Sequence, residues 1–330
     1  MIKDGILILN KPQNWTSHDC VAVARRALGV DKLGHGGTLD PMAEGLLPLF
    51  VGRATRIMEY LDMDDKTYRC QVKLGITTDT QDIWGQVIDE GNPENVTKED
   101  FEAALMSFIG PQEQFPPMYS AVRVNGKRLY EYAREGKKIE VKPRQIEVKS
   151  AMLLDFDESS KVGSFEITVS KGTYIRTICN DIGDKLECGA AMSKLCRTKV
   201  GIFTLDNATT PDRLKEIKEA RDSFDGEYQV PVDIADAILS PDQPMFNLGK
   251  ISIAHDRAWY FVAGSHIRWK QVNVLEAPAK LTGVVNKRGR GYDVLYRVYH
   301  EDGRFLGTGY YDQETNELKA DKIFVKRQEL

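Results

Sequence analysis

One acidic residue in this sequence stands where a carboxylate could do covalent chemistry. Asp40 lies between Leu39 and Pro41, near the middle of a stretch, residues 31–48, that contains four glycines. A carboxylate with an ordinary pKa of about 3.9 is ionised at neutral pH and can act as a nucleophile. An aspartate in such a stretch is more often a turn or capping residue. Asp40 alone therefore does not separate a catalytic role from a structural one.

Chemistry that depends on a metal or a cofactor has no matching motif. The five histidines are scattered, and the sequence contains neither H-E-x-x-H nor a C-x-x-C pair. The glycine-rich stretch lacks the order of a P-loop and of a dinucleotide-binding turn, and no G-x-S-x-G elbow is present. The sequence therefore favours an enzyme that uses no metal and no nucleotide cofactor.

Three more polar residues are candidates for the same site, although each has an ordinary structural explanation. His35 is typical of a loop histidine with its hydrogen bonds satisfied. Tyr68 shares a strand face with Cys70 and Val72, which is typical of core packing with a bonded hydroxyl. Arg176 is typical of a surface or ion-pair residue. Taken singly, these residues do not decide the function.

The elements that must position these residues begin with a strand, a loop and a helix. Residues 5–9 predict a buried strand that is closed by residues 10–12. Thr16 or Ser17 can cap a helix that runs to Leu28, with Gly29 as its stop. The dense glycines and the prolines Pro41 and Pro48 predict that residues 31–48 form an ordered loop without regular structure.

Alternation and helical spacing predict the next elements. Residues 66–74 alternate in the manner of a strand. Thr97 opens a capping box for a helix of about three turns that ends at Gly110-Pro111. Residues 165–170 predict another strand, and the turn from Gly172 to Arg176 leads into a helix through Leu186. The second strand-to-helix turn could bring side chains to the first.

Residues 111–145 are expected to form a segment that projects from the core. They are flanked by prolines and rich in basic and aromatic side chains, which are Tyr119, Arg123, Lys127, Arg128, Tyr130, Tyr132 and Arg134. Residues 116–150 hold nine Lys/Arg against four Asp/Glu, and residues 265–297 hold seven against two. Such patches can attract phosphates even on a chain of net charge −4, although charge alone equally fits solvated faces. We interpret 111–145 as an RNA-facing arm.

The chain is long enough for one large domain and one small one. At 330 residues it exceeds the size at which single cores stop growing, about 250–300 residues. From about Pro244 the residue pattern changes to short apolar runs that are separated by glycines, such as 281–285, 294–299 and 305–310. We expect domains at 1–243 and 244–330, the second rich in β-structure.

The cysteines and the start of the chain favour a cytoplasmic protein. Five cysteines without a C-x-x-C pair are typical of reduced thiols. The apolar run before Asn10 has only four residues, too few for a signal sequence or a membrane span.

Five short blocks of sequence, the glycine-rich stretch among them, occur in a distinctive order along the chain. The blocks are Asn10-Lys-Pro with Thr16-Ser17; Lys32-Leu-Gly-His35-Gly-Gly-Thr-Leu-Asp40-Pro-Met-Ala-Glu-Gly-Leu-Leu-Pro48; Lys66-Thr-Tyr68 leading to Leu74-Gly-Ile-Thr-Thr-Asp79-Thr-Gln-Asp82; Pro117-Met-Tyr-Ser-Ala121 with Gly126 and Tyr130; and Lys171-Gly-Thr-Tyr174-Ile-Arg176 with Asp181-Ile-Gly183. Together they resemble the TruB family of tRNA pseudouridine synthases, strongly over about residues 3–205 and weakly beyond. Five collinear blocks are far more specific than any one.

The resemblance implies a role for each candidate. Asp40 is similar to the family's nucleophile, which could attack uracil C6 or ribose C1′, with initial deprotonation at C2′ as a third route. Arg176 resembles the cation that pairs with this aspartate. Tyr68 resembles the aromatic that stacks on the flipped base and can help to remove the C5 proton. His35 resembles the residue that fills the space the base leaves.

Further residues are implied as pocket walls and RNA contacts. Tyr174 and Leu195 resemble walls of the uracil pocket. The candidates for RNA binding are Lys11, Arg123, Lys127 and Arg128.

The resemblance also implies a fold and a substrate. It implies an α/β (α+β) pseudouridine-synthase fold with a large, mixed but mostly antiparallel sheet and a small C-terminal PUA-like domain. The implied substrate is the uridine at position 55 in the T arm of tRNA, converted by a monomer without a cofactor. One departure is Gly36, where the family usually carries Thr; another is Ala43-Glu44-Gly45, where it often carries Ala-Thr-Gly.

Two other functions stay open at this point. One is an RNA-folding chaperone, which would keep the basic patches and tolerate the loss of Asp40. The other is a hydrolase that pairs Asp40 with a second carboxylate, such as Asp79 or Asp82.

Overall fold

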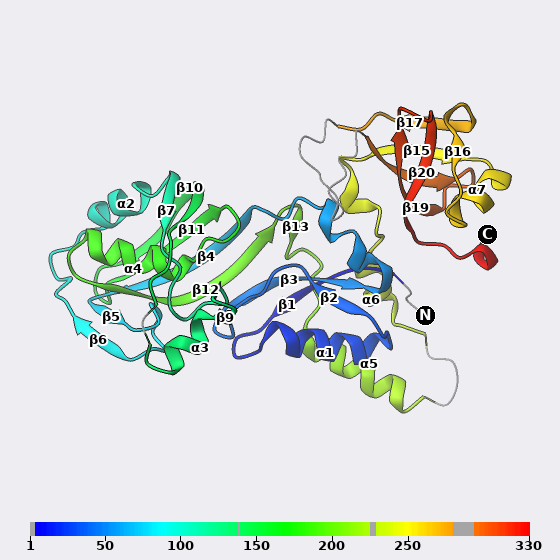
Figure 1. Cartoon of the computed structure of the whole chain (residues 1–330). Coiled ribbons are helices and arrows are strands. Elements are labelled where there is room, and N and C mark those ends of the chain that lie inside the picture. The colour runs from blue at the N-terminus through cyan, green and yellow to red at the C-terminus, as the bar shows by residue number, and fades with distance from the viewer. Residues whose placement is uncertain (1–3, 138, 225–228, 280–293) are drawn as a thin grey trace.

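The computed structural model describes residues 4–137, 139–224, 229–279 and 294–330 (Figure 1). Its largest unit is a mixed sheet whose strands run in the order β14-β1-β3-β12-β4-β11-β10-β7, with β2 and β13 paired at the side. The strands are β1 (Gly5–Lys11), β2 (Leu33–His35), β3 (Glu44–Val51), β4 (Lys66–Leu74), β7 (Gly110–Gln114), β10 (Arg144–Asp157), β11 (Val162–Val169), β12 (Ala190–Val200), β13 (Phe203–Thr204) and β14 (Ile238–Leu239). All but one of their pairings are antiparallel, as expected.

The exception lies in the middle of the sheet and builds the site. Strand β12 pairs parallel to β3 at Cys196↔Glu44 and antiparallel to β4 along its length. The register with β4 sets Leu195 opposite Cys70 and Arg197 opposite Tyr68. This arrangement brings the glycine-rich stretch, which precedes β3, to the two strands that carry Tyr68 and Leu195.

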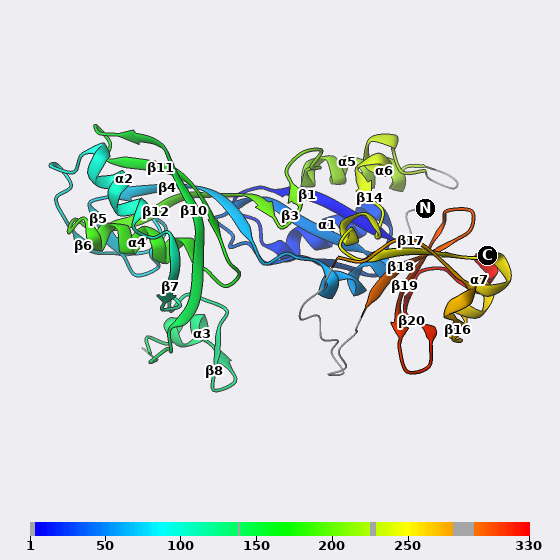
Figure 2. The same ribbon diagram turned by 90° about the horizontal axis from the view of Figure 1, so that it is seen from above.

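Two pairs of helices cover the two halves of this sheet (Figures 1 and 2). Helices α1 (Ser17–Leu28) and α5 (Pro211–Asp222) share an apolar core with β1 and β3. Helices α2 (Lys98–Met106) and α4 (Ile175–Lys185) share another with β4, β10, β11 and β12. None of the helices in the described ranges is long and apolar enough to cross a membrane.

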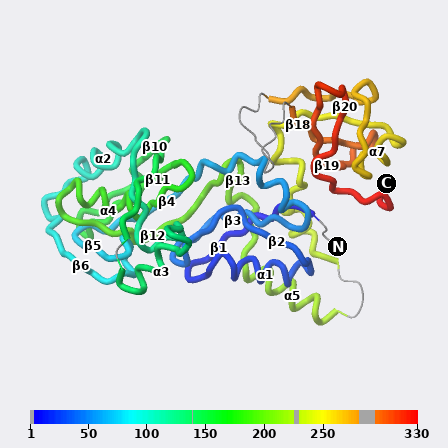
Figure 3. The backbone as a smooth tube through the Cα atoms, viewed as in Figure 1, coloured from blue at the N-terminus to red at the C-terminus, as the bar shows by residue number. Residues whose placement is uncertain are grey.

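A second, six-stranded sheet forms a module near the C-terminus, at the opposite end of the elongated molecule from α2 (Figure 3). It consists of β15 (Gly249–Ile253), β16 (Ile267–Arg268), β17 (Val272–Glu276), β18 (Leu295–His300), β19 (Phe305–Asp312) and β20 (Glu317–Ile323), with α7 (His255–Val262) against it. The module docks beside β3, where Lys322 and Glu59 form an ion pair of 2.7 Å and Arg56 donates to the Ile323 carbonyl. The expected β-rich module is thus confirmed, while the apolar run 281–285 and residues 280–293 of the second basic patch fall outside the described residues.

The short-range predictions are confirmed. Helix α1 begins after a Thr16 cap and ends at Gly29, whose φ of 65° suits a glycine. Strand β4 buries Tyr68, Cys70, Val72 and Leu74 on one face. The Thr97 capping box is present, but the helix after it ends at Met106, one turn earlier than expected.

Two boundaries near the site were wrong. Residues 31–48 are not all loop, because residues 33–35 form β2 and residues 44–48 belong to β3. Pro48 lies inside a strand, where proline usually marks an edge or an end. The arm is also shorter than 111–145, since β7 pairs with β10 in the main sheet. Its described residues are 115–137 and 139–143, which contain β8 (Arg123–Val124), β9 (Lys127–Arg128) and α3 (Leu129–Arg134).

Candidate active site

The loop between β2 and β3, residues 36–43, carries Asp40 and is held from the side of α1. The buried Ser17 hydroxyl accepts a hydrogen bond from the Leu39 N–H at 3.0 Å and donates to the Leu39 carbonyl at 3.3 Å. The Pro41 carbonyl accepts from the Asn14 N–H at 2.8 Å and from Lys11 Nζ at 3.3 Å. The backbone is therefore fixed on both sides of Asp40.

Arg197 on β12 holds the same loop from the other side. Its guanidinium, only 1% exposed, donates from Nε to the Leu46 carbonyl at 2.9 Å and from Nη2 to the Gly37 carbonyl at 3.0 Å. Nη1 reaches the Thr38 carbonyl at 3.4 Å. Gly45 permits this approach, since its φ is 102° and a Cβ there would lie 2.3 Å from the Arg197 carbonyl oxygen.

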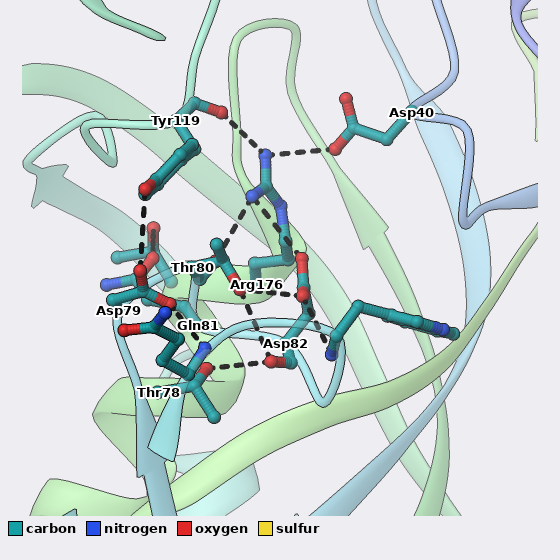
Figure 4. Close-up of polar contacts among 11 residues, drawn as sticks. Asp40, Thr78, Asp79, Thr80, Gln81, Asp82, Tyr119 and Arg176 are labelled. Atoms are coloured by element: carbon teal, nitrogen blue, oxygen red, sulfur yellow. Dashed lines mark hydrogen bonds and ion pairs between the residues drawn. The ribbon is translucent and has the colours of Figure 1, made fainter. Parts of the chain in front are cut away.

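Asp40 forms an ion pair with Arg176 on α4, with 3.0 Å between Oδ2 and Nη2 (Figure 4). The same arginine donates to the Tyr119 carbonyl at 3.0 Å and the Thr80 carbonyl at 3.1 Å, and its Nη1 lies 3.5 Å from Asp82 Oδ2. These contacts fix the guanidinium, whose side chain is 8% exposed while that of Asp40 is 50% exposed. A rigid buried cation thus orients a carboxylate that remains accessible.

A pocket of about 120 Å³ opens beside this ion pair. Its lining residues are Thr38, Leu39, Asp40, Ala43, Tyr68, Thr173, Tyr174, Ile175, Arg176 and Leu195. Tyr174 is fixed by Gln114, whose amide oxygen accepts from the Tyr174 N–H at 2.8 Å and whose amide nitrogen donates to the Tyr174 carbonyl at 3.0 Å. The structure therefore brings together five of the six residues expected at the site.

The Tyr68 hydroxyl lies in a charged but dry environment. Burial raises the pKa of Tyr68, and the Asp40 charge acts in the same direction. The Arg197 charge opposes that rise. The hydroxyl is consequently protonated at neutral pH, with the arginine as the one neighbour that favours the phenolate.

His35, the sixth expected residue, ends β2 and does not line the pocket. Its ring makes an edge-on contact with His18, with 5.8 Å between the ring centroids. Burial lowers the pKa of His35, and the nearby positive charges of His18 and Arg197 lower it further. A neutral imidazole therefore stands at the start of the Asp40 loop.

The assignment of Lys11 as an RNA contact was wrong. Its side chain is buried, at 0% exposure, and Nζ donates to the carbonyls of Trp15 at 2.7 Å, Pro12 at 2.9 Å and Pro41 at 3.3 Å. A long cation at the end of a strand looks like a surface residue in sequence, but here it ties the first loop to the loop of Asp40.

The other three RNA candidates lie on the arm. Arg123 and Arg128 are exposed, and the Arg128 guanidinium donates to the Tyr130 hydroxyl at 3.0 Å. Lys127 pairs with Glu135 and lies over the Tyr132 ring, 4.8 Å from its centroid. The arm thus presents the interleaved basic and aromatic side chains that the sequence indicated.

Neither Asp79 nor Asp82 faces the pocket as a second carboxylate. Asp82 is buried, accepts from the Thr80 hydroxyl at 2.7 Å and lies behind Arg176. Asp79 accepts from the Gln86 N–H at 2.8 Å. Within the described ranges, no group of three or more His, Cys, Asp or Glu side chains is arranged to hold a metal ion.

Gly36, where the resemblance implied a threonine, is closely surrounded. A Cβ there would lie 3.0 Å from Phe50 Cε2 and 3.1 Å from Met63 Sδ. A side chain at this position would require both neighbours to shift, so the packing of this chain is matched to glycine.

Sequence reasoning missed two residues of the site, Ser17 and Arg197. Ser17 was considered only as a helix cap, yet Thr16 takes that role and leaves the Ser17 hydroxyl for Leu39. Arg197 had a usable signal, because it lies two residues after Leu195 in a strand and therefore on the same face.

Comparisons with known proteins agree with this geometry. A family model described as TruB family pseudouridylate synthase (N terminal domain) matches residues 25–175, and one described as tRNA pseudouridylate synthase B C-terminal domain matches residues 176–242. A relative named tRNA pseudouridine synthase B from Clostridium kluyveri is 38% identical over 98% of this chain and 100% of its own. Another of that name from Symbiobacterium thermophilum is 50% identical over 64% of this chain and 71% of its own.

A solved structure supports the fold along the whole chain. The crystal structure of a Cbf5-Nop10-Gar1 complex contains a chain with a TM-score of 0.66 and 24% identity, covering 98% of this chain and 86% of that one. At this identity the likeness concerns the fold alone, and it includes the C-terminal module that neither family model reaches.

Proposed function

This chain belongs to the TruB family of pseudouridine synthases, and we propose that it isomerises the uridine at position 55 in the T arm of tRNA, with Asp40 as covalent catalyst. The observation that supports Asp40 most directly is its ion pair with Arg176 in a pocket whose other lining residues are aliphatic, aromatic or threonine. Among the pocket-lining residues in the described ranges, Asp40 is the only carboxylate.

The arrangement suits a carboxylate nucleophile. Arg176 holds one oxygen of Asp40, while half of the side chain stays accessible. Such a carboxylate can attack uracil C6 or ribose C1′, or begin the reaction at C2′. In each route the glycosidic bond breaks, and the base turns and is rejoined through C5 before it can escape. A small pocket walled by Tyr68, Tyr174 and Leu195 would retain the base and exclude water.

The target uridine must leave its loop to reach this pocket. Extrusion of a base costs a few kcal/mol, on the order of what stacking on an aromatic ring returns. Tyr68 is the aromatic that would stack on the uracil inside the pocket. His35, neutral and at the start of the loop, would fill the space that the base leaves in the RNA.

The arm would grip the RNA from outside. Arg123, Lys127 and Arg128 project on β8 and β9, and Tyr119 at the base of the arm contacts Arg176 through its carbonyl. Contacts of this kind go to phosphates and depend on salt. We further propose that the C-terminal module, 244–330, is PUA-like and adds RNA contacts, and that the protein acts as a monomer in the cytoplasm, where its five free cysteines would stay reduced.

Replacement of the nucleophile tests the proposal. Purified Asp40→Asn and Asp40→Ala variants should bind a T-arm stem-loop as the unmodified protein does, yet form no pseudouridine, whereas a matched Asp89→Asn variant on the exposed strand β6 (Val87–Glu90) should convert the RNA normally. Retained conversion by Asp40→Asn would refute covalent catalysis. An unmodified protein that binds and refolds RNA without making pseudouridine would support the chaperone function instead.

The same reaction mixtures distinguish the hydrolase. A hydrolase that used Asp40 with a second carboxylate would release free uracil and leave an abasic site. The positions of Asp79 and Asp82 argue against it, and we expect chromatography to find neither product.

A further inference from the structure

Arg197 carries a buried charge that its contacts do not explain. Its hydrogen bonds go to the backbone carbonyls of Leu46, Gly37 and Thr38, and none of its contacts in the described part of the chain is with a carboxylate. A neutral donor could serve such carbonyls, while burial of a cation is costly unless it is paired. Burial accordingly lowers the pKa of Arg197. The charge therefore needs a partner that is absent from the resting state.

Tyr68 is placed to become that partner. It lies directly opposite Arg197 in the β4–β12 register, and both side chains are buried on the same face of the sheet. Tyr68 also lines the pocket beside Asp40. Arg197 itself does not line the pocket, so it can reach a bound base only through the tyrosine or through the loop it holds.

We propose that Arg197 is a positioning residue that holds the Tyr68 oxygen as the acceptor of the C5 proton and balances the charge of its phenolate. The inference rests on the proposed function, since only pseudouridine formation requires C5 to lose a proton. Once the base is joined to the ribose through C5, the C5–H bond breaks and its electron pair restores the C5–C6 double bond. For this step the Tyr68 hydroxyl first gives its own proton to solvent, and the resulting phenolate takes the C5 proton. N1, freed from the ribose, gains a proton from solvent, so the base and the tyrosine both end neutral.

The asymmetry of charge around Tyr68 supports this assignment. Asp40, the ionised neighbour on the pocket side, disfavours a second negative charge, and burial does the same. Arg197 is the neighbour that acts in the opposite direction. A cation fixed by three carbonyls does not have to reorganise when the phenolate forms, which is the condition for effective electrostatic stabilisation.

The competing explanation is that Arg197 only builds the loop of Asp40. Loss of the arginine would then slow the steps that involve the nucleophile and leave proton removal unaffected. The two explanations differ in which step becomes rate-limiting, and an isotope at C5 reports on that step.

The test compares single-turnover rates on a T-arm stem-loop whose target uridine carries either hydrogen or deuterium at C5. We expect Arg197→Gln, which keeps a donor but loses the charge, to slow conversion about 100-fold, the low end of what general acid–base catalysis contributes. We expect the C5 isotope effect to rise above that of the unmodified protein. A slower reaction with an unchanged isotope effect would overturn the proposal and leave Arg197 as a loop-building residue.

Two further variants keep the result decisive. If Arg197→Gln does not fold, Arg197→Lys is used instead, because it retains the charge with a shorter reach to Tyr68. It should show a smaller loss of rate and still a raised isotope effect. An unchanged isotope effect would again overturn the proposal. Arg69→Gln is the matched control, because Arg69 is the exposed neighbour of Tyr68 and pairs with Glu166 at 3.0 Å; it should leave rate and isotope effect unchanged. Failure of the unmodified protein to form pseudouridine would refute the proposed function itself, a different outcome from failure of the isotope test.

Discussion

Replacement of Lys11 distinguishes its buried position from the surface role that its sequence suggests. The structure gives the ammonium three carbonyl acceptors, one of which belongs to Pro41, the residue after Asp40. In Lys11→Met the side chain keeps its approximate volume but donates no hydrogen bond. The carbonyl oxygens lose their donor inside the protein, where water cannot replace it.

The size of the effect follows from these contacts. Leaving a buried acceptor unsatisfied costs about 1–3 kcal/mol, and removal of the ammonium relieves part of its own burial. We therefore expect the free energy of unfolding to fall by about 1–3 kcal/mol rather than by three times that amount. Because Pro41 loses one of its two donors, Asp40 should also be less well placed, and a misplacement worth about 1.4 kcal/mol would slow conversion tenfold.

Denaturant unfolding and RNA binding at several salt concentrations measure the two consequences. Lys11→Met should be less stable, yet its binding should show the same dependence on salt as the unmodified protein. The control Arg123→Met, an exposed arginine on the arm, should keep its stability and lower the salt slope by about 1. A reduced salt slope in Lys11→Met with unchanged stability would refute the buried position and restore the phosphate contact.

Three more outcomes follow from other parts of the structure. Asp82→Asn should slow conversion by about tenfold without weakening RNA binding, because Arg176 loses one of its two carboxylates. A normal rate would show that Arg176 is held without the charge of Asp82. Gly45→Ala should lower the free energy of unfolding by about 2–4 kcal/mol. Its positive φ strains an alanine backbone, and the new Cβ would overlap the Arg197 carbonyl oxygen at 2.3 Å. Unfolding at an unchanged denaturant midpoint would contradict this prediction. Burial raises the pKa of Asp181 to about 6, so its charge opposes folding increasingly as pH rises from about 4 to 6. Asp181→Asn should therefore raise the melting temperature at pH 8 but not at pH 4. An equal effect at both pH values would refute the raised pKa of Asp181.

Local features of the fold could be predicted because they depend on neighbours in sequence. The cap of α1, its glycine stop and the alternation of β4 are settled within one turn or one pleat. The end of α2 was harder to predict from the sequence, because Phe108 keeps the helical spacing of apolar residues but lies beyond the helix, in the core. Pro48 was misread because its tolerance depends on which strands lie beside β3, and those strands come from distant parts of the chain.

The residues of the site likewise divide into those that the sequence predicted and those that only the folded structure places. Asp40, Tyr68, Tyr174 and Arg176 could be proposed because motifs in fixed order mark them, and Leu195 because the family resemblance implies it. The structure brings all five to one pocket. The burial of Lys11 and Arg197 could not be predicted, because burial of a cation is decided by the carbonyls that surround it. Those carbonyls belong to loops that meet only after the sheet has formed.

The central position of β12 also determines when the enzyme can first exist during its synthesis. Asp40 leaves the ribosome early, but Arg197 follows 157 residues later, and the sheet cannot close between β3 and β4 without it. At about 5–20 residues per second, the nascent chain carries the Asp40 loop without Arg197 for about 8–30 s. Pairings across such long separations also form slowly. A chain cut short before β12 would therefore contain every residue of the Asp40 loop but lack Leu195 and Arg197, so the pocket beside Asp40 could not form.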